Sequence, residues 1–230
     1  FGLTVDNLDD YKYLFVNRDN KEYKVISVEK NKYAILGISN IEYMQADILD
    51  LGKLGKKFDI IECAGVLHHM DNPMAGWKIL TDCLKPGGIM RIALYSELAR
   101  QHIVKIRNEI KQSGIGSSSD DMRSFREMIL KSNKDHHKKI LASNDFYSLS
   151  TFRDLLFHIQ EHRFTISQIQ ECLCELQLKF CGFEAGHLVK DFKFQYQDEE
   201  ALYDLNKWKA YEESNPNSFA RMYQFWCQKV

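Results

Sequence analysis

The chain has 230 residues, and its 31 Lys and Arg against 32 Asp and Glu give a formal net charge of −1. This balance excludes a global field that attracts DNA, RNA or an anionic membrane, so nucleic acid is not an expected partner. No apolar run reaches the roughly twenty residues of a membrane-spanning helix, and the first residues lack the pattern of a secretion signal. We therefore expect a cytoplasmic protein without a membrane partner.

The first half of the chain predicts an α/β core. Residues 73–84 repeat apolar side chains at helical spacing, and Lys85-Pro86-Gly87-Gly88 ends that helix. A strand, a helix and a strand in about 35 residues form a βαβ crossover, which places ligands at the carboxyl ends of the strands. Short apolar runs bounded by turn signals predict buried parallel strands at residues 41–44, 58–64 and 89–94.

The second half predicts a helical cap followed by a return to the core. We expect a single domain with a nucleotide-binding core (1–95), incomplete at its N-terminal end, a cap inserted before the last strands (96–176), and a segment that completes the core (177–230). Helices are predicted at residues 96–110, 122–131, 151–162, 167–176 and 198–213, with strands at 178–184 and 220–230.

Asp47 is the first candidate binding residue. A strand that ends in a small residue before Asp47 places one carboxylate at the carboxyl edge of the sheet. This carboxylate can accept a hydrogen bond from an exocyclic amine while Ile48 packs on a purine face. The alternative interpretation is that Asp47 caps the next turn.

The segment FDIIECAGVLHHM at residues 58–70 is more specific. The small residues Cys63, Ala64 and Gly65 let a ligand approach the backbone closely, and His68 and His69 begin the crossover. The spacing D-x-I-x-x-x-x-V-L-H-H, then D-x-P, a helix and L-K-P-G-G resembles the Rossmann-type S-adenosylmethionine-dependent methyltransferases. The resemblance implies a Rossmann-like, doubly wound sheet that is mostly parallel, with an antiparallel C-terminal strand.

Later segments narrow this resemblance. MRIALYSELARQ, FYSLSTFRDLLFHIQEHRFT, LKFCGFE and NPNSFARMYQFWCQK are similar to the catalytic domain of bacterial methyltransferases often fused to tetratricopeptide repeats, over residues 37–230. It implies that S-adenosylmethionine is the cofactor, S-adenosylhomocysteine the product, and a repeat region a possible part of a longer parent protein. It also implies adenosine recognition by Asp47 and Ile48, with Cys63, Ala64 and Gly65 beside the sulfonium and His68 near the methyl-transfer path.

The N-terminal segment departs from the family pattern. Such enzymes have a glycine-rich G-x-G-x-G loop after the first strand, yet no glycine occurs between Gly2 and Gly37. Glu29 is the candidate carboxylate for the ribose hydroxyls. This departure keeps a second hypothesis open, in which the chain is a non-catalytic binding module with a methyltransferase fold.

A third hypothesis is a zinc hydrolase. His158, Glu161 and His162 match H-x-x-E-H, in which two histidines one helical turn apart bind zinc and the glutamate activates water. We favour a substrate-facing or structural polar cluster, because no third ligand is identifiable. His136 and His137 lie in a lysine-rich segment and are expected to be solvated.

The acceptor is predicted to be a small molecule or a protein. Methyl transfer from a sulfonium mainly requires positioning, exclusion of water and the removal of one proton. We predict His68, Tyr95 and His158 as catalytic residues, because a histidine with a near-neutral pKa is a suitable general base. Residues at or over the carboxyl edge of the sheet are predicted to contact the substrate: His69, Ser96, Arg100, Tyr147, Arg153 and His162.

Overall fold

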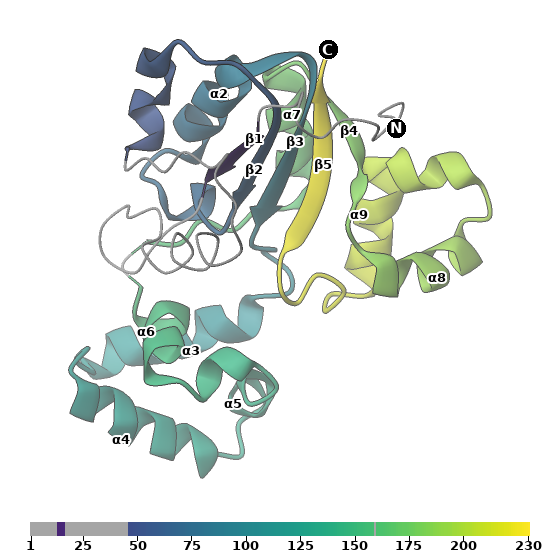
Figure 1. The fold of residues 1–230 in the computed structure, drawn as a ribbon. Helices are drawn as coiled ribbons and strands as arrows, with labels where there is room; N and C mark the ends of the chain where they lie inside the picture. Colours follow the sequence, from purple (N-terminus) through teal and green to yellow (C-terminus); the bar gives the residue numbers. More distant parts are fainter. Residues whose placement is uncertain (1–12, 17–45, 159) are drawn as a thin grey trace, which may run out of the picture.

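The computed structural model describes residues 13–16, 46–158 and 160–230. Its described strands form one five-stranded sheet in the order β1-β2-β3-β5-β4. β1, β2 and β3 are mutually parallel, while β5 is antiparallel to both β3 and β4 (Figure 1). This confirms the predicted α/β fold, mostly parallel with an antiparallel C-terminal strand. The strands are β1 (Tyr13–Val16), β2 (Phe58–Ala64), β3 (Leu84–Leu94), β4 (Leu178–Phe183) and β5 (Tyr223–Lys229).

The predicted crossover between β2 and β3 is present. Short 3-10 helices η2 (Ile48–Leu54) and η3 (Leu67–His69) flank β2, and α2 (Pro73–Cys83) leads to β3. Helix α2 begins at Pro73 because the Asn72 side chain accepts a hydrogen bond from Ala75 N and proline suits a first helical position. It ends at Cys83, and β3 follows at once, so Lys85-Pro86-Gly87-Gly88 lies within the strand rather than in the predicted turn.

The main core lies between the sheet and helices α2, α7 (Ile166–Glu175) and α9 (Leu205–Ser214). Trp77 of α2 is fully buried and lies 6.0 Å from Phe225 of β5 between ring centroids. Trp208 of α9 stacks on Phe192 at 3.7 Å. Burial of apolar surface contributes roughly 25 cal/mol per Å² to stability. The buried aromatic side chains of α2 and α9 therefore hold these helices in the main core against the sheet that positions the site.

The cap between β3 and α7 has a separate apolar core. Its buried residues include one from each α-helix of the cap: Ile106, Phe125, Ile140 and Phe152. Helix α7 instead buries its apolar face in the main core, so the cap that packs on itself is shorter than the 96–176 expected from sequence. Its elements are α3 (Gln101–Ser113), α4 (Ser119–Leu130), α5 (Asp135–Ile140), η4 (Asn144–Phe146) and α6 (Leu149–Phe157).

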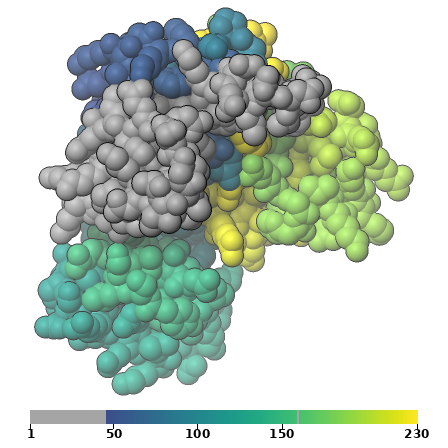
Figure 2. Space-filling view, viewed as in Figure 1, coloured from purple at the N-terminus to yellow at the C-terminus, as the bar shows by residue number. Residues whose placement is uncertain are grey.

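Figures 1 and 2 show the cap and a second helical lobe protruding from the sheet in different directions. The second lobe contains α8 (Gly186–Gln195) and η5 (Glu199–Tyr203), followed by α9. The predicted helix at 198–213 is therefore two elements. In the part of the chain that the structure describes, no helix has both the length and the apolarity needed to cross a membrane.

Several predicted boundaries are wrong for local reasons. The helix predicted from residue 96 begins at Gln101, because Ser96 forms the buried turn that precedes it. The helix predicted at 167–176 begins one residue earlier, at Ile166, because Thr165 is its N-cap: the Thr165 side chain accepts from Gln168 N, and the Gln168 side chain accepts in return from Thr165 N. His137, predicted to be solvated, is fully buried because it faces α3. The strand predicted at 41–44 lies outside the described residues.

Candidate functional site

The site begins where β2 and β3 end. Cys63 pairs with Ile92 and Ala64 with Ala93, so the two parallel strands finish side by side at one edge of the sheet. Gly65 follows with φ +76°, in the left-handed region that favours glycine. Among the described residues, a Cβ placed on Gly65 would meet nothing within 4 Å. The backbone at the end of β2 is therefore open to close approach by a ligand.

Four aromatic rings gather at this edge. His68 lies 4.0 Å from Tyr95 and 4.4 Å from His69, measured between ring centroids. His69 in turn lies 4.2 Å from His158, which follows the last cap helix. Three segments distant in sequence, after β2, after β3 and after α6, thus contribute to one cluster, which we call the histidine cluster (His68, His69, Tyr95, His158).

The segment that returns from the cap is bonded to the loops after both strands. His162 N donates to His68 O at 2.7 Å, and Phe164 N donates to Tyr95 O at 2.8 Å. Glu97 N donates back to Phe164 O at 2.8 Å, completing a short parallel bridge between Ser96 and Phe164. These backbone bonds hold the return segment (residues 160–164) across the carboxyl edge of the sheet.

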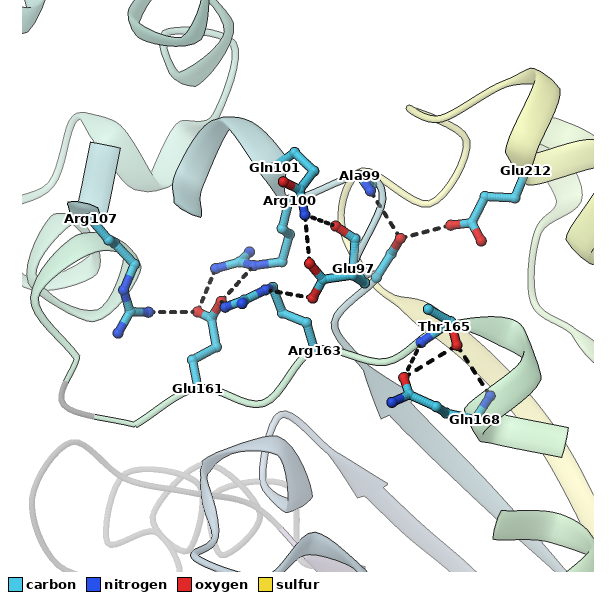
Figure 3. Close-up of polar contacts among 11 residues, drawn as sticks. Glu97, Ala99, Arg100, Gln101, Arg107, Glu161, Arg163, Thr165, Gln168 and Glu212 are labelled. Atoms are coloured by element: carbon cyan, nitrogen blue, oxygen red, sulfur yellow. Dashed lines mark hydrogen bonds and ion pairs between the residues drawn. The ribbon is translucent and has the colours of Figure 1, made fainter. Parts of the chain in front are cut away.

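Beside this segment, three arginines surround one buried carboxylate. The Glu161 side chain is 1% exposed, and Arg100 binds it through Nε at 3.1 Å and Nη2 at 2.7 Å. Arg107 Nη1 lies 3.1 Å and Arg163 Nη1 3.6 Å from the same carboxylate (Figure 3). The Arg100 guanidinium also stacks over the Tyr95 ring at 3.6 Å. The arginine cluster (Arg100, Arg107, Arg163) therefore joins the cap to the histidine cluster.

Comparison with known proteins decides the family. Residues 19–149 match the family model described as a methyltransferase domain, which is more than half of the chain. The chain belongs to the methyltransferase domain family. This assignment confirms the predicted methyltransferase family, and the α/β sheet agrees with its Rossmann-type fold.

A curated protein is similar to this chain over much of its length. A Synechococcus protein, itself uncharacterized, is 27% identical over 185 residues, which cover 74% of this chain and 43% of that protein. The methyltransferase chain thus spans less than half the length of that curated relative. The predicted tetratricopeptide-repeat region stays a prediction.

Solved structures agree on the fold. PKMT2 from Rickettsia typhi superposes with a TM-score of 0.63 at 16% identity, covering 88% of this chain and 41% of PKMT2. Its complex with AdoHcy gives a TM-score of 0.64 at 17% identity, covering 93% and 43%. At this identity the likeness establishes a shared fold.

The zinc interpretation of H-x-x-E-H is wrong in this methyltransferase. Helix α6 ends at Phe157, and His158 adopts an extended conformation with φ −64° and ψ 134°, so the two histidines do not lie one helical turn apart. The Glu161 carboxylate, which would activate water in that mechanism, is bound by three guanidiniums instead. The motif overlaps the start of the return segment, and its glutamate binds the arginine cluster.

The structure brings the predicted catalytic residues together. His68, Tyr95 and His158 all belong to the histidine cluster, as does the predicted substrate residue His69. His69 Nδ1 lies 2.9 Å from Gln160 O, which joins it to the return segment. Burial raises the pKa of Tyr95, and the nearby Arg100 opposes that effect in part. At neutral pH the Tyr95 hydroxyl is therefore protonated and able to donate a hydrogen bond.

Two predicted substrate residues have structural partners instead. Ser96 is fully buried, donates to Glu212 Oε1 at 2.7 Å and accepts from Ala99 N at 3.0 Å. Arg100 is 5% exposed and bound to Glu161. Both residues follow β3 as expected, but their polar atoms are bound to α9 and to the return segment, and contact with a substrate stays a prediction for both.

The predicted cap residues lie apart from one another. Tyr147 is 61% exposed, and its hydroxyl donates to Leu141 O within the cap. Arg153 lies on α6, where its Nε is buried and has no hydrogen-bond partner among the described residues. His162 is close to the histidine cluster through its backbone, and its Nε2 lies 3.2 Å from Gln160 Nε2. No described contact joins Tyr147 to the histidine cluster.

The predicted cofactor residues are partly described. Asp47 is exposed and caps η2, with its Oδ1 accepting from Leu49 N at 2.9 Å, which matches the capping alternative. Ile48 is 3% exposed and packs in the main core, so its side chain presents little surface to a purine. Burial raises the pKa of Cys63 to about 12, so this thiol is neutral beside Ala64 and Gly65. Glu29 lies outside the described residues.

Two residues of the arginine cluster, Arg107 and Arg163, were not singled out from the sequence. Arg100 and Arg107 are seven residues apart, a spacing that places them on the same helix face. This spacing indicates that Arg100 and Arg107 contact the same partner. It does not identify Glu161, which lies 54 residues beyond Arg107 along the chain.

Proposed function

We propose that this methyltransferase holds S-adenosylmethionine against the open backbone at Gly65 and methylates a small-molecule or protein acceptor presented at the histidine cluster. The observation that carries the proposal is the convergence of His68, Tyr95 and His158 where β2 and β3 end. Ligands of open α/β sheets bind at this edge. We therefore assign methyl transfer to the edge of the sheet where β2 and β3 end.

The residues at the end of β2 fit the cofactor. No atom of the described part of the chain occupies the position of a Gly65 side chain, so the backbone can contact a bound nucleoside directly. Cys63 is small, buried and neutral, and therefore adds no competing charge next to a sulfonium. The exposed carboxylate of Asp47 supports an acceptor role toward an amine, since it keeps a second oxygen besides the Oδ1 that caps η2.

The histidine cluster supplies what methyl transfer requires from the protein. When bound, S-adenosylmethionine supplies a methyl group already activated by its positive sulfur. His68 and His158 carry imidazoles that can accept the proton the acceptor loses. Tyr95, protonated at neutral pH, can donate a hydrogen bond that orients the acceptor. The return segment lies across these residues and supports exclusion of water.

Calorimetry with S-adenosylhomocysteine tests the proposal. The wild-type chain should bind it, and Gly65→Ala should weaken binding at least about tenfold, which corresponds to about 1.4 kcal/mol. Gly87→Ala is the matched control, because Gly87 has φ +74° and equally open surroundings but lies at the opposite end of its strand. Both substitutions impose a similar backbone strain of about 1 kcal/mol, so only the affinity should differ.

Asp47→Ala tests the second contact, with Asp50→Ala as its control. Asp50 lies on the same short helix and pairs with Lys53 at 2.6 Å. Asp47→Ala should lower the affinity for S-adenosylhomocysteine, whereas Asp50→Ala should leave it unchanged. Absence of binding by the wild-type chain would refute the proposal and favour the non-catalytic binding module. Equal affinity of the two glycine variants would show that the cofactor does not contact Gly65.

A further inference from the structure

Away from the histidine cluster, three ligand-type side chains converge inside the cap. His136 Nε2 lies 2.7 Å from Glu109 Oε1, and His137 Nε2 lies 2.8 Å from Glu109 Oε2. The two imidazole rings are 4.5 Å apart at 67°. Among the described residues, this is the group of three such side chains whose donor atoms all lie within 4.8 Å of one another.

The three side chains are largely closed to solvent. His137 is fully buried, and the side chains of His136 and Glu109 are 20% and 25% exposed. Both imidazoles present Nε2 to the carboxylate and donate a hydrogen bond to it, so each can bind a metal through Nε2 once that proton has moved to Nδ1.

We propose that Glu109, His136 and His137 form a zinc-type metal site that fastens α5 to α3. Two imidazole nitrogens and one carboxylate are a ligand set that Zn²⁺ accepts in a tetrahedral arrangement, with water as the fourth ligand. Bonds of about 2.0–2.1 Å place tetrahedral ligands roughly 3.3 Å apart. The present contacts of 2.7 and 2.8 Å must therefore open by about half an ångström, which side-chain rotation provides.

Lys134 occupies the cation position in the metal-free arrangement. Its ammonium lies 2.8 Å from Glu109 Oε1, and its side chain is 56% exposed, so it can swing into solvent when a metal enters. A single positive charge that stays about 4 Å from a divalent ion opposes its binding by about 2 kcal/mol in water, a factor of about thirty. Removal of Lys134 should therefore strengthen the site.

The test uses the full chain stripped of metal with a chelator and titrated with zinc chloride at pH 7. Calorimetry and elemental analysis should give one zinc per chain, bound at this site. His136→Gln should weaken binding more than about 100-fold, because loss of a direct ligand exceeds the 10–100-fold effect of an outer-shell residue. Glu109→Gln provides a second variant that removes the only carboxylate of the site.

Control variants separate this site from other zinc ligands of the chain. Cys174 and His187 are exposed, and His158 belongs to the histidine cluster. Cys174→Ser, His187→Gln and His158→Gln should each retain wild-type affinity. Lys134→Ala should bind zinc more tightly, by up to about thirtyfold.

Three results would overturn the assignment. The first is failure of the wild-type chain to bind one equivalent of zinc. The second is retention of affinity in a folded His136→Gln or Glu109→Gln variant, judged by circular dichroism. The third is loss of binding in one of the control variants instead. None of these results depends on cofactor binding at Gly65, so the metal site and the methyltransferase site are tested separately.

Discussion

Replacement of Glu161 by glutamine should weaken the junction between cap and core. The substitution keeps the shape of the side chain but removes the negative charge that three guanidiniums share. Arg100, whose side chain is 6% exposed, then remains buried without a counter-ion. Breaking a buried ion pair by removing one partner costs about 3–5 kcal/mol.

The expected loss is somewhat smaller because two of the arginines reach water. The side chains of Arg107 and Arg163 are 18% and 24% exposed and can regain part of their hydration. We therefore expect Glu161→Gln to lower the free energy of unfolding by about 2–4 kcal/mol. For a chain of this length, each kcal/mol shifts Tm by about 2–4 °C, so Tm should fall by roughly 4–16 °C.

Glu97→Gln is the matched control. Glu97 also binds Arg163, at 2.9 Å, but its side chain is 36% exposed and Arg163 keeps Glu161 as a second partner. Surface pairs of this kind contribute less than about 1 kcal/mol. Urea unfolding followed by tryptophan fluorescence measures both variants. Equal losses for Glu161→Gln and Glu97→Gln would refute the idea that the buried carboxylate anchors the return segment.

Three further outcomes follow from buried polar groups. The pKa of Glu109 is about 2, against an ordinary value of 4.5. The stabilisation that the Glu109 carboxylate gives the folded state is therefore present above pH 4.5 and lost as the pH falls toward 2. Acid unfolding should show the difference in stability between wild type and Glu109→Gln closing over that range. Tyr223→Phe should cost about 1–3 kcal/mol in urea unfolding, because the hydroxyl lies 2.7 and 2.6 Å from the two oxygens of the buried Glu212 carboxylate. A thiol reagent should modify the exposed Cys174 first, and rapid labelling of Cys63, whose pKa burial raises to about 12, would contradict the packing described here.

The parts of the fold that sequence predicted correctly are those that local rules decide. Strand β2 is a short, mostly apolar run, and α2 has its own start signal in Asn72 and Pro73. The periodicity of the cap predicted helices there, although it placed their ends too early or too late. Helix α8 was not predicted, because Phe192 is its buried residue while Phe194 is 89% exposed, which leaves little periodic pattern to detect.

The position of the candidate site was predictable from the sequence, but the contacts between residues distant along the chain were not. Residues after β2 and β3 must meet because parallel neighbours end at one edge, and this brought His68 and Tyr95 together. The partner of Arg100 lies 61 residues away along the chain, and nothing local to either residue indicates it. The H-x-x-E-H motif suggested a glutamate that activates water, whereas Glu161 of the return segment is bound by the arginine cluster.

The position of β5 in the sheet bears on how the polypeptide matures. β4 pairs with β5 and β5 with β3, so β4 has no neighbour in the described sheet before residues 223–229 arrive. During synthesis on the ribosome, the βαβ unit and the cap can form before β5 exists, while Phe180 and its neighbours in β4 remain unpaired. The nascent polypeptide therefore exposes an unpaired edge until then, which is the stage at which chaperone binding would protect it most.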